Sequence, residues 1–169
     1  MTQKFTSAAT AVNGKAGKLP AAFSKLDNLV TPGAYFILDY GCGSNTDLPR
    51  AWCAAHGCRY LPYDPFNQPD DVNRSSREMA VLAKACGYPV IGVCSNVLNV
   101  IDSDDAVQTV VNNLQALTNL AVVTVYEGDG KGTGRQTGPD QWQRNEKLRA
   151  YERFAPGCCT FRAGCMIIK

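Results

Sequence analysis

The feature that most restricts the fold of this chain is a set of four short apolar runs that alternate with segments of helical periodicity. The runs cover residues 34–40, 58–63, 88–97 and 120–126. Each has the length and continuity of a strand that is buried on both faces of a parallel sheet. Parallel neighbours need a long connection between them, and the helical segments supply it. The pattern predicts an α/β fold.

Start and stop signals place the helices between these runs. Residues 45–47 offer N-cap side chains for a helix that a glycine ends, and this helix forms a βαβ unit with its flanking strands. The stretch 68–77 is polar and rich in turn residues, so we expect the next helix only over 79–85. Residues 102–105 begin another helix, which carries apolar residues up to Leu117.

The last third of the chain has a different pattern. Residues 127–140 hold five of the fifteen glycines and no aliphatic or aromatic residue, which predicts a long loop. We expect residues 141–154 to be helical. Two short apolar runs, 158–161 and 165–169, flank a turn at 162–164 and predict an antiparallel hairpin that closes the sheet at its C-terminal end.

The first 30 residues carry lysines but no acid before Asp27, and they favour an amphipathic helix with a turn at Asn13-Gly14. They lack the apolar stretch of a secretory signal. A length of 169 residues is that of one domain. We therefore expect residues 1–169 to form a single domain, with residues 1–30 as its N-terminal helical segment.

Eight cysteines raise the question of disulfides or a metal. Without a secretory signal, cysteines inside apolar segments are expected to be reduced and buried, which indicates a cytoplasmic protein. Cys53, His56 and Cys58 offer three zinc ligands, but their spacing does not match a zinc finger, so we predict no metal site. No apolar run approaches the ~18 residues of a membrane span, and we expect no membrane partner.

The first apolar run ends in the motif LDYGCG, residues 38–43. Glycines at this turn permit a tight bend and let backbone N–H groups approach a ligand. The dinucleotide fingerprint G-x-G-x-x-G is broken because Thr46 stands at the third glycine position, which disfavours a nicotinamide-dependent oxidoreductase. Asp64 ends the next run, where a carboxylate can accept hydrogen bonds from both hydroxyls of a ribose. These residues predict an adenosine site without a diphosphate.

With LDYGCG at 38–43, YDPF at 63–66 and IGVCSNVLNVID at 91–102, the chain resembles the class I S-adenosylmethionine-dependent methyltransferases over residues 34–126. The resemblance implies a Rossmann-like methyltransferase fold in trimmed form, which is a doubly wound and mostly parallel sheet. It also implies S-adenosyl-L-methionine as cofactor. The cofactor contacts that it implies are Asp39, Gly41, Cys42, Gly43, Asp64, Pro65, Phe66, Ser95, Asn96 and Val97.

The resemblance gives separate roles to three of these residues. Asp64 would hold the ribose, and Phe66 would flank the adenine. Asn96 is the candidate catalytic residue, because its amide oxygen can orient an amine acceptor; a capping role for the same side chain is the alternative. A looser resemblance, to methyltransferases associated with DNA phosphorothioation systems, extends over 97–101, the glycine-rich loop, 137–143 and 163–164.

Residues 127–151 follow the fourth run at the edge where open α/β sheets bind ligands, and we expect them to form a lid over the methyl acceptor. The substrate contacts predicted within the lid are Arg135, Thr137, Trp142, Gln143 and Arg144. Cations suit phosphates, while Trp and Gln suit a base, so DNA or RNA is the expected acceptor. A net charge of +2 does not decide the matter.

Three alternatives remain open on the sequence alone. The cations of the lid are equally consistent with a solvated face. The acceptor of a methyltransferase could be a small anionic metabolite instead of a nucleic acid. The chain could also be a catalytically silent module that binds S-adenosylmethionine, because fold alone does not choose among functions.

Overall fold

The computed structural model of the protein describes residues 3–8, 17–27, 33 and 35–169. Its strands are β1 (Phe36–Tyr40), β2 (Arg59–Tyr63), β3 (Val90–Ser95), β4 (Leu120–Thr124), β5 (Arg135–Gly138), β6 (Gln141–Gln143), β7 (Cys159–Arg162) and β8 (Cys165–Ile168). Its helices are α1 (Phe23–Leu26), α2 (Asp47–Ala55), α3 (Asp70–Ala85), α4 (Asp104–Leu117) and the 3₁₀ helices η2 (Leu98–Val100) and η3 (Leu148–Phe154).

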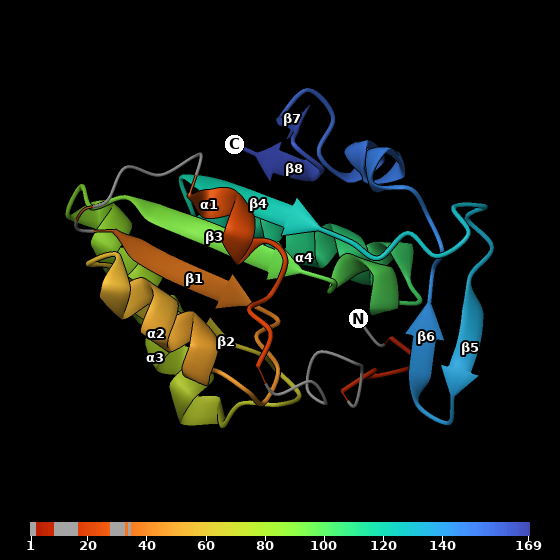
Figure 1. The fold of residues 1–169 in the computed structure, drawn as a ribbon, viewed down its shortest axis with the longest axis horizontal. Helices are drawn as coiled ribbons and strands as arrows, with labels where there is room; N and C mark the ends of the chain where they lie inside the picture. Colours follow the sequence, from red (N-terminus) through yellow and green to blue (C-terminus); the bar gives the residue numbers. More distant parts are fainter. Residues whose placement is uncertain (1–2, 9–16, 28–32, 34) are drawn as a thin grey trace.

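Six strands form one sheet in the order β2-β1-β3-β4-β8-β7, and β5 pairs with β6 in a separate hairpin (Figure 1). Strands β1 to β4 are parallel to one another. Strand β8 is antiparallel to both of its neighbours, β4 and β7. The predicted α/β class, the mostly parallel sheet and the closing hairpin are therefore confirmed.

Helices cover both faces of the sheet, because successive strand residues point to opposite sides (Figure 1). On one face, Ile37 packs with Phe23 of α1 and Cys53 of α2. Its neighbour Leu38 belongs to the core of the other face, with residues of α3, η3 and α4 such as Leu114. The central strands are thus buried from two sides, which explains their continuous apolar composition.

Helix α3 begins nine residues earlier than the sequence predicts. The polar stretch 68–77 is not a turn: the helix starts directly after Pro69, and Asp70 and Asp71 occupy its first turn, where acidic side chains favour a helix. Asn73 and Ser76 are buried on its inner face. Polar residues there conceal the apolar stripe on which the prediction depended.

The segment 127–154 differs most from its prediction. The expected loop contains β5, and the expected helix over 141–154 is a strand, β6, followed by an irregular stretch with a left-handed Asn145 and then by η3. The backbone N–H of Arg144 donates a hydrogen bond to the carbonyl of Asn99, 2.8 Å away, which holds this stretch beside η2. A long-range contact overrides the helical preference of the local sequence.

The N-terminal segment also departs from its prediction. Within the described parts of residues 1–30, the only helix is the short α1, and residues 3–8 are not helical. The backbone N–H of Ser7 donates a hydrogen bond to the carbonyl of Asp140, 2.9 Å away, which joins residues 3–8 to the β5–β6 hairpin. The predicted turn at Asn13-Gly14 lies outside the described residues. No helix in the described part of the chain is long and apolar enough to span a membrane.

Candidate functional site

A pocket of about 270 Å³ opens at the carboxyl ends of β1, β2 and β3. The chain runs from β1 to β2 on one side and later returns to β3 on the other side of β1, so the strand order reverses at this point. Open α/β sheets bind their ligands in the crevice that such a reversal creates. The pocket therefore lies where the fold class most often carries a binding site.

Nine of the ten residues that the resemblance implies as cofactor contacts line this one pocket. They come from three separate turns: Gly41, Cys42 and Gly43 after β1; Asp64, Pro65 and Phe66 after β2; and Ser95, Asn96 and Val97 at the end of β3. The tenth residue, Asp39, lies outside the lining. The sheet brings together segments that are up to 56 residues apart in the sequence, from Gly41 to Val97.

The glycine turn after β1 is built for a close approach to β3. Gly41 has a φ of +81°, and a Cβ at this position would lie 2.3 Å from Cγ2 of Val97. The N–H groups of Gly41 and Cys42 donate to the carbonyl of Tyr63, at 2.7 and 3.2 Å. We expected these N–H groups to face a ligand, but they tie β1 to β2.

The carboxylate of Asp64 organises the turns around it. Its Oδ1 accepts hydrogen bonds from the backbone N–H groups of Phe66 and Asn67, at 2.9 and 3.0 Å. Its Oδ2 accepts from the N–H of Gly43 at 2.9 Å and from the side-chain amide of Asn67 at 3.3 Å. These four bonds use the acceptor sites of a carboxylate. Asp64 therefore links the turns after β1 and β2.

Asn73 of α3 supports this arrangement and was not singled out by the sequence. Its Oδ1 accepts from the N–H of Asp64 at 2.8 Å, and its Nδ2 donates to the carbonyls of Asp64 and Gln68. The side chain of Gln68 in turn donates to the carbonyl of Gly43 at 2.6 Å. The sequence held no signal for Asn73, because the expected helix began only at residue 79 and a polar side chain does not indicate a buried position.

Asp39 lies beneath the pocket floor and is only 2% exposed. Its Oδ2 accepts a hydrogen bond from the hydroxyl of Tyr60 at 2.8 Å. Burial raises the pKa of Asp39 to about 7; the bond from Tyr60 opposes this shift, and the charge of Asp64 adds to it. The side chain of Asp39 thus bonds to β2 within the sheet, and Asp39 does not line the pocket as the resemblance implies for a cofactor contact.

Helix α4 supplies a wall that the sequence did not predict. Ala106, Thr109, Val110 and Asn113 line the pocket from α4. The side-chain amide of Asn113 donates to the hydroxyl of Tyr40 at 2.9 Å, and the ring of Tyr40 lies 4.6 Å from that of Tyr63. These contacts depend on how α4 packs over the sheet, so no local pattern could have identified them.

Two residues of the pocket lining differ in exposure: Phe66 is exposed and Asn96 is half-buried. Phe66 is 48% exposed, which leaves a face of its ring available to a ligand. Asn96 adopts a φ of +58°, a left-handed conformation that asparagine tolerates, and its backbone N–H donates to the carbonyl of Thr124 at 2.8 Å. No hydrogen bond joins the Asn96 side chain to another described residue, so the structure does not assign it a capping role.

Residues 3–8 form the outer wall of the pocket, and the hairpin anchors them. Thr6 and Ser7 line the pocket, and the N–H of Thr6 donates to the carboxylate of Asp140 at 2.9 Å. The ring of Phe5 stacks on that of Trp142, with centroids 5.6 Å apart and planes 11° from parallel. The predicted lid over 127–151 therefore adjoins the pocket through residues 3–8, while β5 and β6 do not line it.

The five predicted substrate contacts fall into two groups. Arg135 and Thr137 of β5 are exposed. Trp142 is stacked on Phe5, and Gln143 bonds to the side chain of Asn99 and to the carbonyl of Tyr126. Arg144, like Trp142 and Gln143, contacts other parts of the protein. Because it is only 7% exposed, its interpretation as part of a solvated face is wrong.

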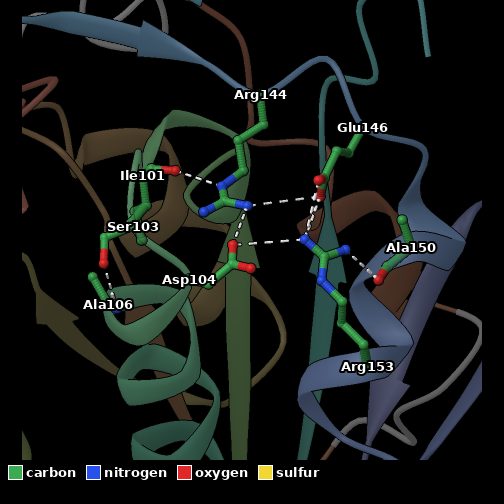
Figure 2. Close-up of polar contacts among 8 residues, drawn as sticks. All are labelled: Ile101, Ser103, Asp104, Ala106, Arg144, Glu146, Ala150 and Arg153. Carbon is green, nitrogen blue, oxygen red and sulfur yellow. Dashed lines mark hydrogen bonds and ion pairs between the residues drawn. The ribbon is translucent and has the colours of Figure 1, made fainter. Parts of the chain in front are cut away.

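Figure 2 shows how Arg144 is held. Its Nε donates to the carbonyl of Ile101, and its guanidinium pairs with Asp104 at 2.6 Å and with Glu146 at 3.8 Å. Arg153 of η3 pairs with the same two carboxylates, at 3.7 and 3.0 Å. The network fastens the start of α4 to the segment before η3, so the guanidinium of Arg144 is occupied by internal partners.

The cysteines and the histidine do not gather into a metal site. Nδ1 of His56 contacts the carbonyl of Trp52 at 2.7 Å, and the thiol of Cys58 donates to the carbonyl of Gly33. In the described part of the chain, no three His, Cys, Asp or Glu side chains lie together as metal ligands would. Burial raises the pKa of Cys42 and of Cys94 well above the usual range, so both thiols stay protonated.

No protein-family model matches this sequence, and no curated protein matches it. The function is therefore inferred from the pocket.

Proposed function

We propose that the pocket binds S-adenosyl-L-methionine and that the protein is a methyltransferase with a trimmed Rossmann-like methyltransferase fold. The observation that carries this proposal is the convergence of nine implied cofactor contacts on one pocket at the switch point of a parallel sheet. Each turn alone has an ordinary structural explanation. Their convergence is what a shared ligand requires.

The residues present fit an adenosyl group, with one adjustment. The half-exposed ring of Phe66 offers a stacking face for the adenine, and Tyr40 and Val110 offer apolar walls. The volume is close to the lower end of the ~300–1,000 Å³ range of ligand pockets. For a ribose hydroxyl to reach Asp64, it must displace the side-chain amide of Asn67, whose bond of 3.3 Å is the longest of the four.

S-adenosyl-L-methionine would supply a methyl group that its sulfonium already activates. The protein then has to align the acceptor for in-line displacement and exclude water. Asn96 lies in the pocket lining at the end of β3. We assign its amide oxygen the task of accepting a hydrogen bond from an amine acceptor, which points the nitrogen lone pair at the methyl group.

The ionisable groups of the pocket favour an acceptor that needs no prior deprotonation. Burial raises the pKa of Tyr40 and of Cys42, so neither loses its proton at neutral pH. The four hydrogen bonds of Asp64 leave its carboxylate no free acceptor site. A neutral amine, such as the exocyclic amine of a base, meets this condition, and DNA or RNA is the proposed acceptor. As proposed, the enzyme works in the cytoplasm, where thiols such as Cys42 stay reduced.

The same lack of a base supports a second candidate, a catalytically silent module that binds S-adenosylmethionine. Methyl transfer distinguishes the two. We expect tritium from labelled S-adenosylmethionine to appear in mixed DNA or RNA, and we expect Asn96→Gly to lower transfer at saturating cofactor far more than it lowers cofactor affinity. Glycine keeps the left-handed backbone at this position. Cofactor binding without transfer to any acceptor would favour the silent module.

Calorimetric titration tests the cofactor. We expect saturable, sub-millimolar binding of S-adenosylmethionine and of S-adenosylhomocysteine. Phe66→Ala should weaken it by about tenfold, the value of one aromatic stacking contact. Tyr88→Ala is the matched control, because Tyr88 is 51% exposed but precedes β3 at the opposite edge of the sheet. Absence of saturable binding for both ligands would overturn the proposal.

A further inference from the structure

A second hollow, of about 360 Å³, lies at the start of β8, and it is called the basic groove here. Its lining includes Glu127 after β4, Lys147 and Arg149 around the start of η3, and Phe161 and Arg162 of β7. Three cations therefore face one acid, an excess of two positive charges. The basic groove shares no residue with the pocket described above.

The charges of the basic groove are not neutralised by the protein. Lys147, Arg149 and Arg162 are exposed, and none forms an ion pair with a described acidic residue. Glu127 uses its Oε1 to accept the backbone N–H of Leu148 at 2.8 Å. The two arginines of Figure 2, by contrast, are fully paired with Asp104 and Glu146. The three cations of the basic groove thus share one hollow without such partners; other exposed cations, such as Arg59 and Arg74, also form no ion pair with a described acid but do not line it.

A further cation lies beside the groove wall. The Nζ of Lys25 in α1 lies 3.9 Å from where a Cβ of Gly164, a lining residue, would stand. Lys25 and Arg162 also act on Cys165, which lines the groove. Burial raises the pKa of the Cys165 thiol, and the positive charges of Lys25 and Arg162 oppose that shift. The side chain of Arg149 is held over the ring of Phe161, 4.8 Å from its centroid, which orders one guanidinium in the groove.

The basic groove opens at the same edge of the sheet as the candidate cofactor pocket. Strand β8 starts where β4 ends, since Met166 pairs with Val123 (Figure 1). Thr124, the last residue of β4, accepts a hydrogen bond from Asn96 of the pocket. Tyr126 lies between this point and Glu127 of the groove, and its side chain is 63% exposed. Along the chain, an exposed aromatic residue therefore lies between the contact to Asn96 and the first lining residue of the groove.

We propose that the basic groove binds the phosphate backbone of a single-stranded nucleic acid, with a base stacked on Tyr126 on the way to the pocket. Arg and Lys side chains suit phosphate oxygens, and an aromatic platform beside a cationic groove is the arrangement that binds single strands without sequence preference. This inference rests on the proposed function, because it names the acceptor of that reaction. It assigns acceptor binding to Arg149, Arg162 and Tyr126, outside the predicted lid contacts.

Fluorescence anisotropy with labelled, mixed-sequence 15-nucleotide DNA and RNA single strands tests the proposal. In Arg149→Gln/Arg162→Gln we expect about tenfold weaker binding at ~50 mM salt. The slope of log affinity against log salt should fall by about 1.4, from about 0.7 per lost phosphate contact. The control Arg59→Gln/Arg74→Gln removes the same charge from exposed positions elsewhere and should change affinity by less than about twofold.

Calorimetry with S-adenosylmethionine on the same variants separates this inference from the proposed function. We expect cofactor affinity to be unchanged in both double variants. Strand binding without cofactor binding would refute the methyltransferase and leave the groove assignment intact. Equal loss in groove and control variants, or no saturable strand binding by the unmodified protein, would overturn the groove. Sub-millimolar binding of inorganic phosphate without strand binding would overturn it in favour of a small anion.

Discussion

The turns after β1, β2 and β3 and the segment 127–154 lie at the same edge of the sheet, but they are held in opposite ways. The first region is tied by contacts within a turn or to the next strand, such as those of Asp64 to Phe66 and Gly43. The second is tied across the chain, by Arg144 to Ile101 and by Asp140 to Thr6. Turns can be predicted from a few consecutive residues, whereas contacts between distant residues cannot.

The largest expected effect tests the support of the first region. Burial raises the pKa of Asp39 to about 7, against 3.8 ordinarily, so the folded protein holds the proton more tightly than the unfolded chain. Stability should therefore fall as pH rises from about 4 to about 7. Asp39→Asn removes this dependence, and the stability difference between variant and wild type should grow over that range by up to about 4 kcal/mol.

Urea unfolding of both proteins at several pH values measures this difference. Tyr60→Phe provides a second check, since it removes the bond that favours the charged carboxylate and should steepen the pH dependence. A constant difference between Asp39→Asn and wild type from pH 4 to 8 would show that Asp39 is not buried as described.

The second prediction concerns the long-range contacts of the other region. Arg144→Met leaves the carbonyl of Ile101 without its donor and leaves Asp104 and Glu146 with Arg153 alone, and this loss of a buried network should cost about 3 kcal/mol. Arg135→Met, at an exposed position of β5, should change stability by less than about 0.5 kcal/mol. Urea unfolding compares the two. Equal losses of stability in the two variants would show that the long-range contacts of Arg144 do not stabilise this region.

The third prediction separates backbone strain from close packing. Gly41 and Gly87 have nearly the same φ, +81° and +79°, but only at Gly41 would a Cβ meet another residue, Val97, at 2.3 Å. Gly87→Ala should cost about 1 kcal/mol from the left-handed backbone. Gly41→Ala should cost about 2 kcal/mol more, from overpacking against β3. Equal losses in unfolding experiments would mean that the approach to Val97 is not tight.

The smallest expected effect concerns the link between the two regions. Asp140→Ala removes the acceptor of the Thr6 N–H and loosens the outer pocket wall, so S-adenosylmethionine affinity should fall a few-fold while the unfolding midpoint stays the same. Asp129→Ala, which alters only a bond to Lys131 within the same loop, is the control. Calorimetry measures the affinity of both variants. Unchanged affinity in both would show that the hairpin does not support the pocket wall.

For the parallel sheet, the amino-acid sequence by itself was sufficient. Continuous apolar runs predicted β1 to β4, and the residues at their ends predicted which turns would meet, because parallel strands deliver their carboxyl ends to one edge. The C-terminal hairpin followed from two apolar runs around a glycine turn. In each case the strand itself is recognised from a few consecutive residues, although the strands then pair over long distances in the sequence, as Phe36 does with Val90.

Only the tertiary structure decided the rest of the site. Asn73 is polar yet buried, because its amide satisfies the backbone of Asp64. Arg144 looks like a surface cation in the sequence, but partners more than 39 residues earlier enclose it. Residues 3–8 become a pocket wall because distant partners, Asp140 of the hairpin and also Val100 and Asp102, hold them there. Contacts between distant residues leave no periodic pattern in the sequence. Their influence on secondary structure and on the burial of side chains is therefore seen only in the folded chain.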